Sequence, residues 1–406
     1  MDDARAIAEE TARASYGRLL AWLAARTGDV AAAEDALADA FRAALEHWPR
    51  TGAPESPEAW IITTARRKLI DEARKSKTRD NAAPTLLLAS EEAEAAAAKE
   101  TPFPDERLKL MFICAHPAID QNIRTPLMLQ TVLGLDAARI ASAFLTSPKA
   151  MGARLVRAKR KIKAAAIPFV EPPTEQLLQR ISSVLDAIYA AFGTGWNDLD
   201  GPNLEGGLTA EAIFLAKLVT DLTPDEPEAW GLLALLLYAD ARRAAWRAGG
   251  AYVPIDEQDT SLWDREKIAM AEQALARAWR LGRVQRYQLE AAIQSAHVAS
   301  RLHGRDVASD IVLLYESLIS CAPSIGARVG LAAALAKANR CNEALAALDA
   351  IERTVVERYQ PYWAVRAHIL AKVDDKPGAA AAYDRAIGLS SDEAARRFLS
   401  TRKSSL

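Results

Sequence analysis

The segment TPLMLQTVLGLDAARIASAFLTSPKAMGARLVRAKRKIKAAA, residues 125 to 166, constrains the fold of this chain more than any other. It divides into two short helices and a longer third one, because residues that end and begin helices occur at two points. A Gly can end the first helix, an Asp can cap the second, and a Thr or Ser before a Pro can open the third. These residues are Gly134, Asp136, Thr146 or Ser147, and Pro148. The spacing predicts a helix-turn-helix.

The third predicted helix carries positive charge and no negative charge. Its apolar residues recur at helical spacing, and we expect them to be buried. They are Met151, Leu155, Ala158 and Ile162. The cations are Lys149, Arg154, Arg157, Lys159, Arg160, Lys161 and Lys163. An ordinary solvated face is the alternative, but such faces usually mix both signs, so the pattern favours insertion into the major groove of a nucleic acid.

Composition places the chain among soluble, all-α proteins. It has 406 residues, enough for two or three domains, and half of them are hydrophobic, with little period-two alternation. The net charge is only -2, so a contact with DNA would be a local patch. The three cysteines form no CxxC pair, which favours the cytoplasm. The acidic start MDDARAIAEE and the short apolar runs argue against a signal peptide and a membrane span.

Residues 1 to 80 are expected to form a first helical unit. A helix capped by Asp29 would turn one set of side chains inward: Ala36, Leu37, Ala40, Phe41, Leu45 and Trp48. It would turn the acids Glu34, Asp35 and Asp39 outward. Ser56 and Pro57 open the next helix, which presents a second basic face. That face comprises Arg66, Arg67, Lys68, Arg74, Lys75, Lys77 and Arg79.

Three further parts follow along the chain. Residues 81 to 104, rich in Ala and Glu, form either a helical spacer or a flexible linker. Residues 105 to 168 hold the helix-turn-helix, and residues 174 to 406 form a helical C-terminal domain. In that domain, tandem helices with small residues at close approaches indicate tetratricopeptide-like repeats, with an irregular helical bundle as the alternative.

Three segments resemble conserved regions of the extracytoplasmic-function group of bacterial sigma factors. AEDALADAFRAALEHW is similar to the helix that docks on the polymerase clamp, and PEAWIITTARRKLIDEARK to the helix that melts and reads the promoter -10 element. DAARIASAFLTSPKAMGARLVRAKRKIK is similar to the helix-turn-helix that reads the -35 element. Further segments, such as DEQDTSLWD and RYQLEAAIQSAHV, resemble the subgroup with a large tetratricopeptide-like extension. The resemblance therefore covers nearly the whole chain. It implies sigma region 2 at 1 to 80 and sigma region 4 at 105 to 168.

The resemblance implies three sets of site residues. Core polymerase would be bound by Glu34, Asp35, Asp39 and Phe41. The -10 element would be bound by Trp60, Thr63, Arg66, Arg67 and Lys68, where cations hold phosphate and Trp60 either stacks on an unpaired base or belongs to the core. The -35 element would be bound by Lys149, Arg154, Arg157, Lys159 and Arg160, some at phosphates and some at base edges.

Two segments depart from the family pattern. Where members tend to carry CCHPA, this chain has Cys114 followed by Ala115, so one thiol is missing. Where they commonly carry FNEGY, it has FGTGW at 192 to 196, without the amide and the carboxylate. No catalytic constellation, metal-ligand spacing or cofactor motif is found in the sequence. The acidic loop IDEQDTSLWD lacks the glycine and spacing of an EF-hand, so we expect a capped loop between helices.

These patterns predict an alternative sigma factor, not an enzyme. It would direct core RNA polymerase to promoter DNA in the cytoplasm, while a regulatory protein contacts the C-terminal domain. Two alternatives remain: a helical-repeat interaction protein that no longer binds DNA, and a DNA-binding regulator that does not engage polymerase.

Overall fold

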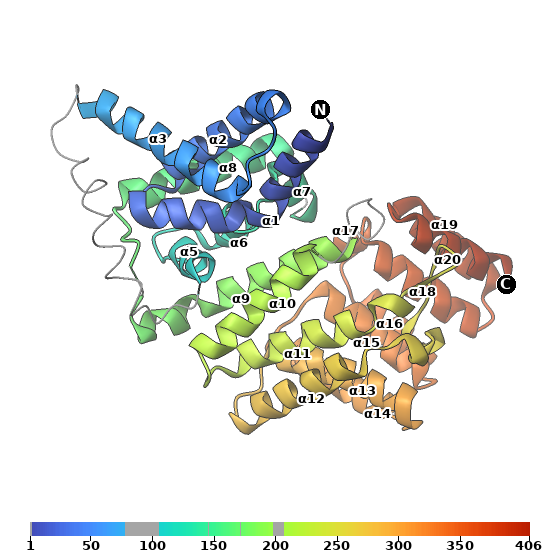
Figure 1. Ribbon diagram of the computed structural model, residues 1–406. Coiled ribbons are helices and arrows are strands. Elements are labelled where there is room, and N and C mark those ends of the chain that lie inside the picture. Colours follow the sequence, from blue (N-terminus) through green and yellow to red (C-terminus); the bar gives the residue numbers. More distant parts are fainter. Residues whose placement is uncertain (1, 78–104, 145, 171, 198–206) are drawn as a thin grey trace. The chain divides into compact units, whose positions relative to one another are not determined.

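The computed structural model describes residues 2–77, 105–144, 146–170, 172–197 and 207–406 (Figure 1). Helices dominate these ranges, which confirms the predicted all-α fold. Their regular β-structure is one short antiparallel pair, β1 (Arg247–Ala248) with β2 (Ala251–Tyr252). The chain forms two compact units, Met1–Thr223 and Pro224–Leu406. The predicted linker at 81 to 104, Arg79, and the side chains of Arg74, Lys75 and Lys77 lie outside the described parts.

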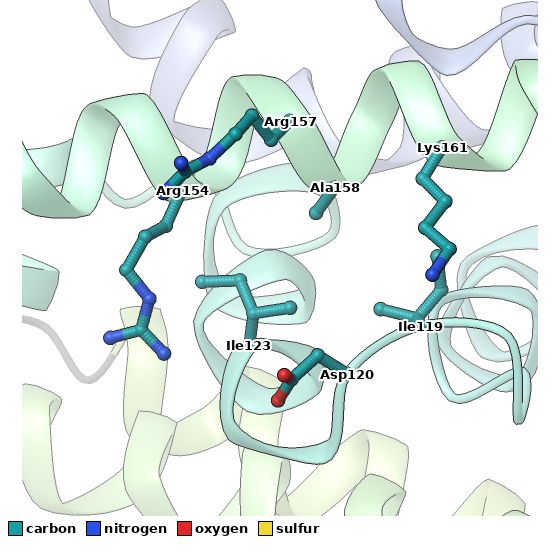
Figure 2. A pocket seen from close by; sticks show the side chains of 7 residues that line it. All are labelled: Ile119, Asp120, Ile123, Arg154, Arg157, Ala158 and Lys161. Carbon is teal, nitrogen blue, oxygen red and sulfur yellow. The ribbon is translucent and has the colours of Figure 1, made fainter.

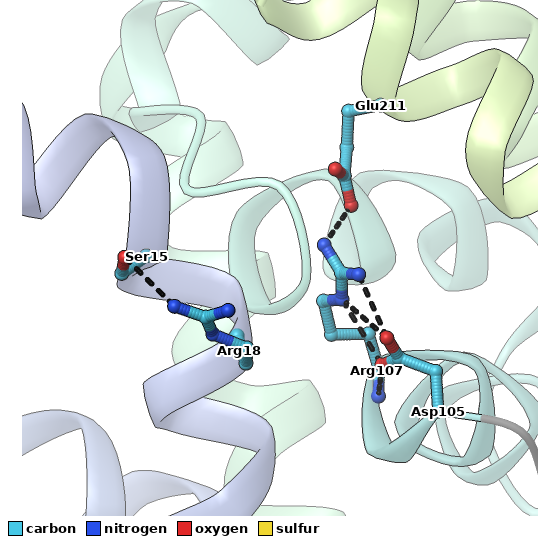
Figure 3. Close-up of polar contacts among 5 residues, drawn as sticks. All are labelled: Ser15, Arg18, Asp105, Arg107 and Glu211. Atoms are coloured by element: carbon cyan, nitrogen blue, oxygen red, sulfur yellow. Dashed lines mark hydrogen bonds and ion pairs between the residues drawn. The ribbon is translucent and has the colours of Figure 1, made fainter.

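The first three helices, α1 (Asp2–Thr27), α2 (Val30–Thr51) and α3 (Pro57–Lys77), pack against one another. Asp29 caps α2 as predicted, because its carboxylate accepts hydrogen bonds from the Ala31 and Ala32 N–H groups, both at 3.1 Å. The buried core includes Leu20, Leu23, Leu37, Trp48 and Ile61. At the start of α3, the Glu58 carboxylate accepts hydrogen bonds from Ser15 and Arg18 of α1, two residues that Figure 3 also shows bonded to each other.

The prediction that Leu45 points inward is wrong, since its side chain is 43 % exposed. The buried stripe of α2 continues through Ala40, Ala44 and Trp48 instead. Residue 45 lies about 100° further around the helix than residue 44, which carries it out of the stripe. Phe41, also predicted to point inward, is only half-buried.

The helix-turn-helix is formed by α5 (Glu106–Cys114), α6 (Gln121–Thr131), α7 (Ala137–Ala143) and α8 (Pro148–Ala164). The residues predicted to end and to cap these helices do so. Gly134 has a φ of 67°, and Asp136 caps α7 by accepting from the Ala138 and Arg139 N–H groups. Of the two residues that could cap α8, Ser147 does so, with its Oγ 3.2 Å from the Ala150 nitrogen. The predicted stripe of α8, from Met151 to Ile162, is buried.

Two more helices, α9 (Thr174–Asn197) and α10 (Gly207–Leu222), belong to the first unit, where α9 packs on α5 and α6. The buried Arg180 guanidinium of α9 donates a hydrogen bond to the Phe112 carbonyl at 3.2 Å. Arg107 of α5 pairs with Asp105 at 2.7 Å and with Glu211 of α10 (Figure 3). These contacts tie the helical pair to the helix-turn-helix, although the predicted domain boundaries themselves stay predictions.

The second unit consists almost entirely of helices, and most successive helices pack on each other. They are α11 (Pro227–Ala241), α12 (Arg265–Arg280), α13 (Arg286–His303), α14 (Ala308–Cys321), α15 (Ile325–Lys337), α16 (Cys341–Asp349), α17 (Arg353–Val356), α18 (Gln360–Lys372), α19 (Lys376–Leu389) and α20 (Glu393–Ser404). Three short 3₁₀ turns lie between α11 and α12: η1 (Arg243–Ala245), η2 (Ile255–Glu257) and η3 (Thr260–Leu262). The acidic loop has the expected capped form, because Asp259 accepts from Ser261 N–H and Asp264 from Lys267 N–H.

Candidate nucleic-acid interface

The predicted recognition helix α8 presents most of its cations to solvent. Lys149, Arg157 and Arg160 are exposed, and Arg154 is half-buried. Lys159 differs, because it is only 8 % exposed and its ammonium group pairs with the Glu34 carboxylate of α2. Four of the five predicted -35 residues are therefore at least partly accessible, while the fifth is held inside the first unit.

A cavity of about 230 Å³ lies between α8 and the start of α6 (Figure 2). Arg154, Arg157 and Lys161 line it from α8, and Asp120 is the one acid among its lining residues. Ile119, Ile123 and Ala158 give it an apolar floor. The guanidinium of Arg154 donates a hydrogen bond to the Asn122 carbonyl at 3.2 Å, which fixes this cation at the rim. The excess of positive charge suits a phosphate oxygen of a nucleic-acid backbone.

The predicted -10 residues lie along α3. Trp60 is half-buried, with its ring 5.5 Å from that of Trp48 in an edge-on contact and 6.4 Å from that of His47 in a stacked one. Trp60 thus packs on the core while part of its side chain stays accessible, and its stacking on an unpaired base stays a prediction.

The polar side chains among the predicted -10 residues differ in their exposure and in their contacts. Arg67 is exposed, and Arg66 lies over the Trp22 ring at 5.8 Å. Lys68 pairs with Asp39 of α2 at 3.3 Å. Thr63 is exposed, and its hydroxyl donates to the Ala59 carbonyl at 2.7 Å, a contact within its own helix. Arg67 is therefore the most accessible cation among the predicted -10 residues.

The predicted polymerase-binding acids are less accessible than expected. Asp35 is exposed, but Glu34 and Asp39 are half-buried, so the prediction that all three face outward is wrong for two of them. The reason is ion pairing with cations that approach α2 from other helices, Lys159 and Lys68. Phe41 lies half-buried on the same helix.

Two contacts near the start of α2 could not be found by sequence reasoning. Burial raises the pKa of the Tyr16 hydroxyl, and the negative charge of Glu34 together with a hydrogen bond to Glu34 raises it further. Lys163, one turn beyond Lys159 on α8, pairs with Asp29 at 2.7 Å. No local spacing signals these contacts, because the partners of both lysines lie far away in the chain.

The Cys114–His116 segment is part of the packing of α5. Burial raises the pKa of the Cys114 thiol to about 12, and its sulfur lies 3.6 Å from the Thr131 hydroxyl. Burial lowers the pKa of His116, as do the nearby charges of Arg180 and Arg124, and its Nδ1 accepts a hydrogen bond from the Ala118 N–H at 3.1 Å. Neither side chain is placed for chemistry on a ligand.

Two kinds of feature are absent from the described ranges. Nowhere in them do three or more His, Cys, Asp or Glu side chains gather in a way that could hold a metal ion. Among their helices, none has the length and apolar character needed to cross a membrane.

Comparison with known proteins assigns the first helices to a class. Residues 12–79 match the model of sigma-70 region 2, which covers α2, most of α1 and α3 of the structure. Residues 12–79 are thus similar to region 2 of sigma-70 factors, which supports a role in promoter recognition. Residues 180–279 match a family of unknown function (DUF6596).

The chain also belongs to the family of a bacterial relative. It is 35 % identical over 374 residues to "Uncharacterized protein R00370" of Rhizobium meliloti (strain 1021). The aligned region covers 90 % of this chain and 88 % of the relative. No solved structure matches the chain.

Proposed function

We propose that this protein is an alternative sigma factor of the extracytoplasmic-function group. The observation that carries the proposal is the combination of a matched sigma-70 region 2 with a capped helix-turn-helix. The last helix of the helix-turn-helix carries no acid, and its exposed cations include Lys149, Arg157 and Arg160. A sigma factor needs both elements, because it holds one promoter at two separate places.

The roles follow the accessible side chains. Arg67, with Trp60 and Thr63 beside it on α3, would bind the opened -10 strand through phosphate contacts and stacking. Lys149, Arg154, Arg157 and Arg160 on α8 would bind the -35 duplex. Asp35 and Phe41 of α2 would contact core RNA polymerase, joined by Glu34 and Asp39 once their cations are displaced.

The C-terminal domain would regulate initiation through protein contacts in the cytoplasm. Its successive packed helices support a tetratricopeptide-like arrangement of the kind that presents an extended binding surface. Its partner would be a regulatory protein that binds this surface.

Runoff transcription with core polymerase and genomic fragments tests this proposal. Initiation at defined start sites, dependent on the added protein, is expected. Binding to DNA without initiation would instead favour a regulator that does not engage polymerase. Absence of both would favour a helical-repeat interaction protein.

A further inference from the structure

Three basic side chains gather around the end of α5 and the turn that leads to α6. His116 lies in this turn, Arg124 contacts the turn from α6, and Arg180 contacts the last turn of α5 from α9. All three are anchored by neutral groups. Within the part of the chain that the structure describes, none of them forms an ion pair with a carboxylate. We call these three residues the basic cluster.

Arg180 is the innermost member of the basic cluster. Its guanidinium donates to the Phe112 carbonyl at 3.2 Å and to the Gln176 side-chain oxygen at 2.6 Å, both neutral acceptors. Its Nε is buried and has no hydrogen-bond partner among the described residues. The side chain is only 5 % exposed, and a buried cation is costly unless an opposite charge lies beside it. Arg180 is therefore a buried cation for which the described residues supply no counter-charge.

The two other members keep unused donors as well. Arg124 donates from Nε to the Ile119 carbonyl at 2.9 Å and from Nη2 to the Pro117 carbonyl at 3.4 Å, which leaves its Nη1 group over. The Nδ1 of His116 accepts from the Ala118 N–H, so the proton of the neutral ring is on Nε2 and can be donated. Both side chains are half-buried, so a ligand can reach them.

The charges in the basic cluster act on one another without compensation. Burial lowers the pKa of Arg180, and the positive charge of Arg124 lowers it further. The pKa of His116 is lowered by burial and then by both arginines. Asp120, four residues from both His116 and Arg124, is the nearest acid to them along the chain. It is exposed, and its carboxylate caps α6 by accepting from the Asn122 N–H at 2.9 Å. The cluster therefore has the charge of an anion site.

We propose that His116, Arg124 and Arg180 bind a phosphate group, carried by inorganic phosphate or by a small phosphate monoester. Guanidinium groups match the geometry of phosphate oxygens, and phosphate brings more negative charge than a carboxylate against two arginines. The buried position of Arg180 favours a small compound over a phosphate of duplex DNA. The site goes beyond the proposed function and does not depend on it.

A phosphate bound there would connect three parts of the first unit. Arg124 belongs to α6, His116 to the turn before it, and Arg180 to α9. A ligand that binds only the folded arrangement stabilises it by mass action. Phosphate would therefore hold α9 more firmly on the helix-turn-helix, which makes a small phosphate compound an input to the part of the chain that carries α8.

Isothermal titration calorimetry of the full chain tests the site, with potassium chloride of equal ionic strength as the blank. The probes are inorganic phosphate and adenosine 5′-monophosphate. Arg124→Gln removes one charge, and His116→Asn keeps an oxygen that can accept from the Ala118 N–H but removes the Nε2 donor. Arg305→Gln is the matched control, because Arg305 is exposed and has no ion pair among the described residues. Circular dichroism verifies that each variant is folded.

The expected result is saturable binding to one site in the wild type and in Arg305→Gln. Affinity should fall about tenfold in Arg124→Gln and by a smaller factor in His116→Asn, since bonds from charged donors are the stronger ones. Tighter binding of the nucleotide would identify a phosphate monoester as the ligand, and equal binding would identify the phosphate group alone. If Arg124→Gln does not fold, His116→Asn decides the question.

Three results would overturn the phosphate site: no saturable heat with either probe, equal affinity in all four chains, or loss of promoter binding in the site variants without phosphate uptake by the wild type. The last would assign the basic cluster to the DNA backbone. Each of these results leaves the sigma-factor proposal intact. Phosphate binding by a chain that does not support initiation would overturn the proposed function and keep the site.

Discussion

Lys159 and Glu34, 125 residues apart in the chain, form a buried ion pair between α8 and α2. One residue was predicted to read the -35 element and the other to bind polymerase. Their pairing means that two binding surfaces expected to act separately share a contact in the isolated chain. It also divides the predicted cations of α8 into an accessible group and an internal one.

The accessible cations of α8 should provide affinity for DNA. We expect Arg157→Ala to weaken promoter binding. If Arg157 contacts a phosphate, the slope of log affinity against log salt concentration should fall by about 1 in magnitude. If Arg157 contacts a base edge, the variant should lose about 1–3 kcal/mol of discrimination between promoter sequences. Arg154→Ala should weaken binding as well, because Arg154 lines the cavity beside α6. Fluorescence titrations at several salt concentrations measure both. Lys376→Ala, an exposed change in the second unit, serves as the control, and unchanged binding in both Arg variants would rule out α8 as the recognition helix.

The cap of α7 should contribute to stability. Asp136→Ala removes the acceptor for two N–H groups and is expected to lower the free energy of unfolding by about 1 kcal/mol. Asp136→Asn keeps a capping oxygen and should be nearly neutral. Urea denaturation followed by circular dichroism gives the difference, and equal losses in both variants would contradict the capping role.

The anchor between α9 and α5 should be stronger than a surface ion pair. Arg180→Ala leaves the buried Phe112 carbonyl without the hydrogen bond from Arg180, so a loss of about 1–3 kcal/mol is expected. Arg5→Ala breaks only the exposed Arg5–Glu9 pair and should change stability by less than about 0.5 kcal/mol. Thermal unfolding of the two variants compares them directly; similar midpoints would show that α9 is not anchored there.

The second unit should show a pH dependence that comes from Glu228. Burial raises the pKa of this carboxyl to about 7 from an ordinary 4.5, although N–H groups of Tyr287 and Gln288 at 3.0 and 3.2 Å favour the charged form. Between those values the folded chain keeps a proton that the unfolded chain has lost. The stability from this group is thus complete below 4.5 and falls as the pH rises through 7, by at most about 3 kcal/mol.

Glu228→Gln removes this titration while keeping an oxygen that can accept the same hydrogen bonds. The free energy of unfolding of the variant minus that of the wild type should therefore be larger at pH 8 than at pH 5. Denaturation midpoints of both chains at the two pH values measure this difference. An equal difference at both pH values would mean that Glu228 is charged throughout.

Local signals in the sequence predicted local structure well. Asp136, Gly134 and Pro148 act within a few residues of themselves, so their roles can be read from neighbouring positions. The helical period likewise predicted the buried stripe of α8. It failed at Leu45, which lies about 100° around the helix from Ala44 and so falls outside the buried stripe.

The candidate site was harder to predict because its electrostatics are non-local. Residue types alone placed Glu34 and Lys159 on different functional surfaces, and only the packing of α8 on α2 brings them together. The acceptor for Arg180 is a backbone carbonyl, which any residue at position 112 would supply. Charge spacing therefore identified candidate ligand-binding residues, but could not show which of them form ion pairs with each other.

The buried thiol of Cys114 makes the helix-turn-helix resistant to oxidants. A protonated sulfur with no solvent access reacts slowly with peroxides and alkylating reagents, since the thiolate is the nucleophile. Cys321 and Cys341, which are more accessible, should be labelled first. Alkylation of Cys114 would then mark the moment at which α5 separates from α6, so a native residue of this chain can report when the helix-turn-helix unfolds.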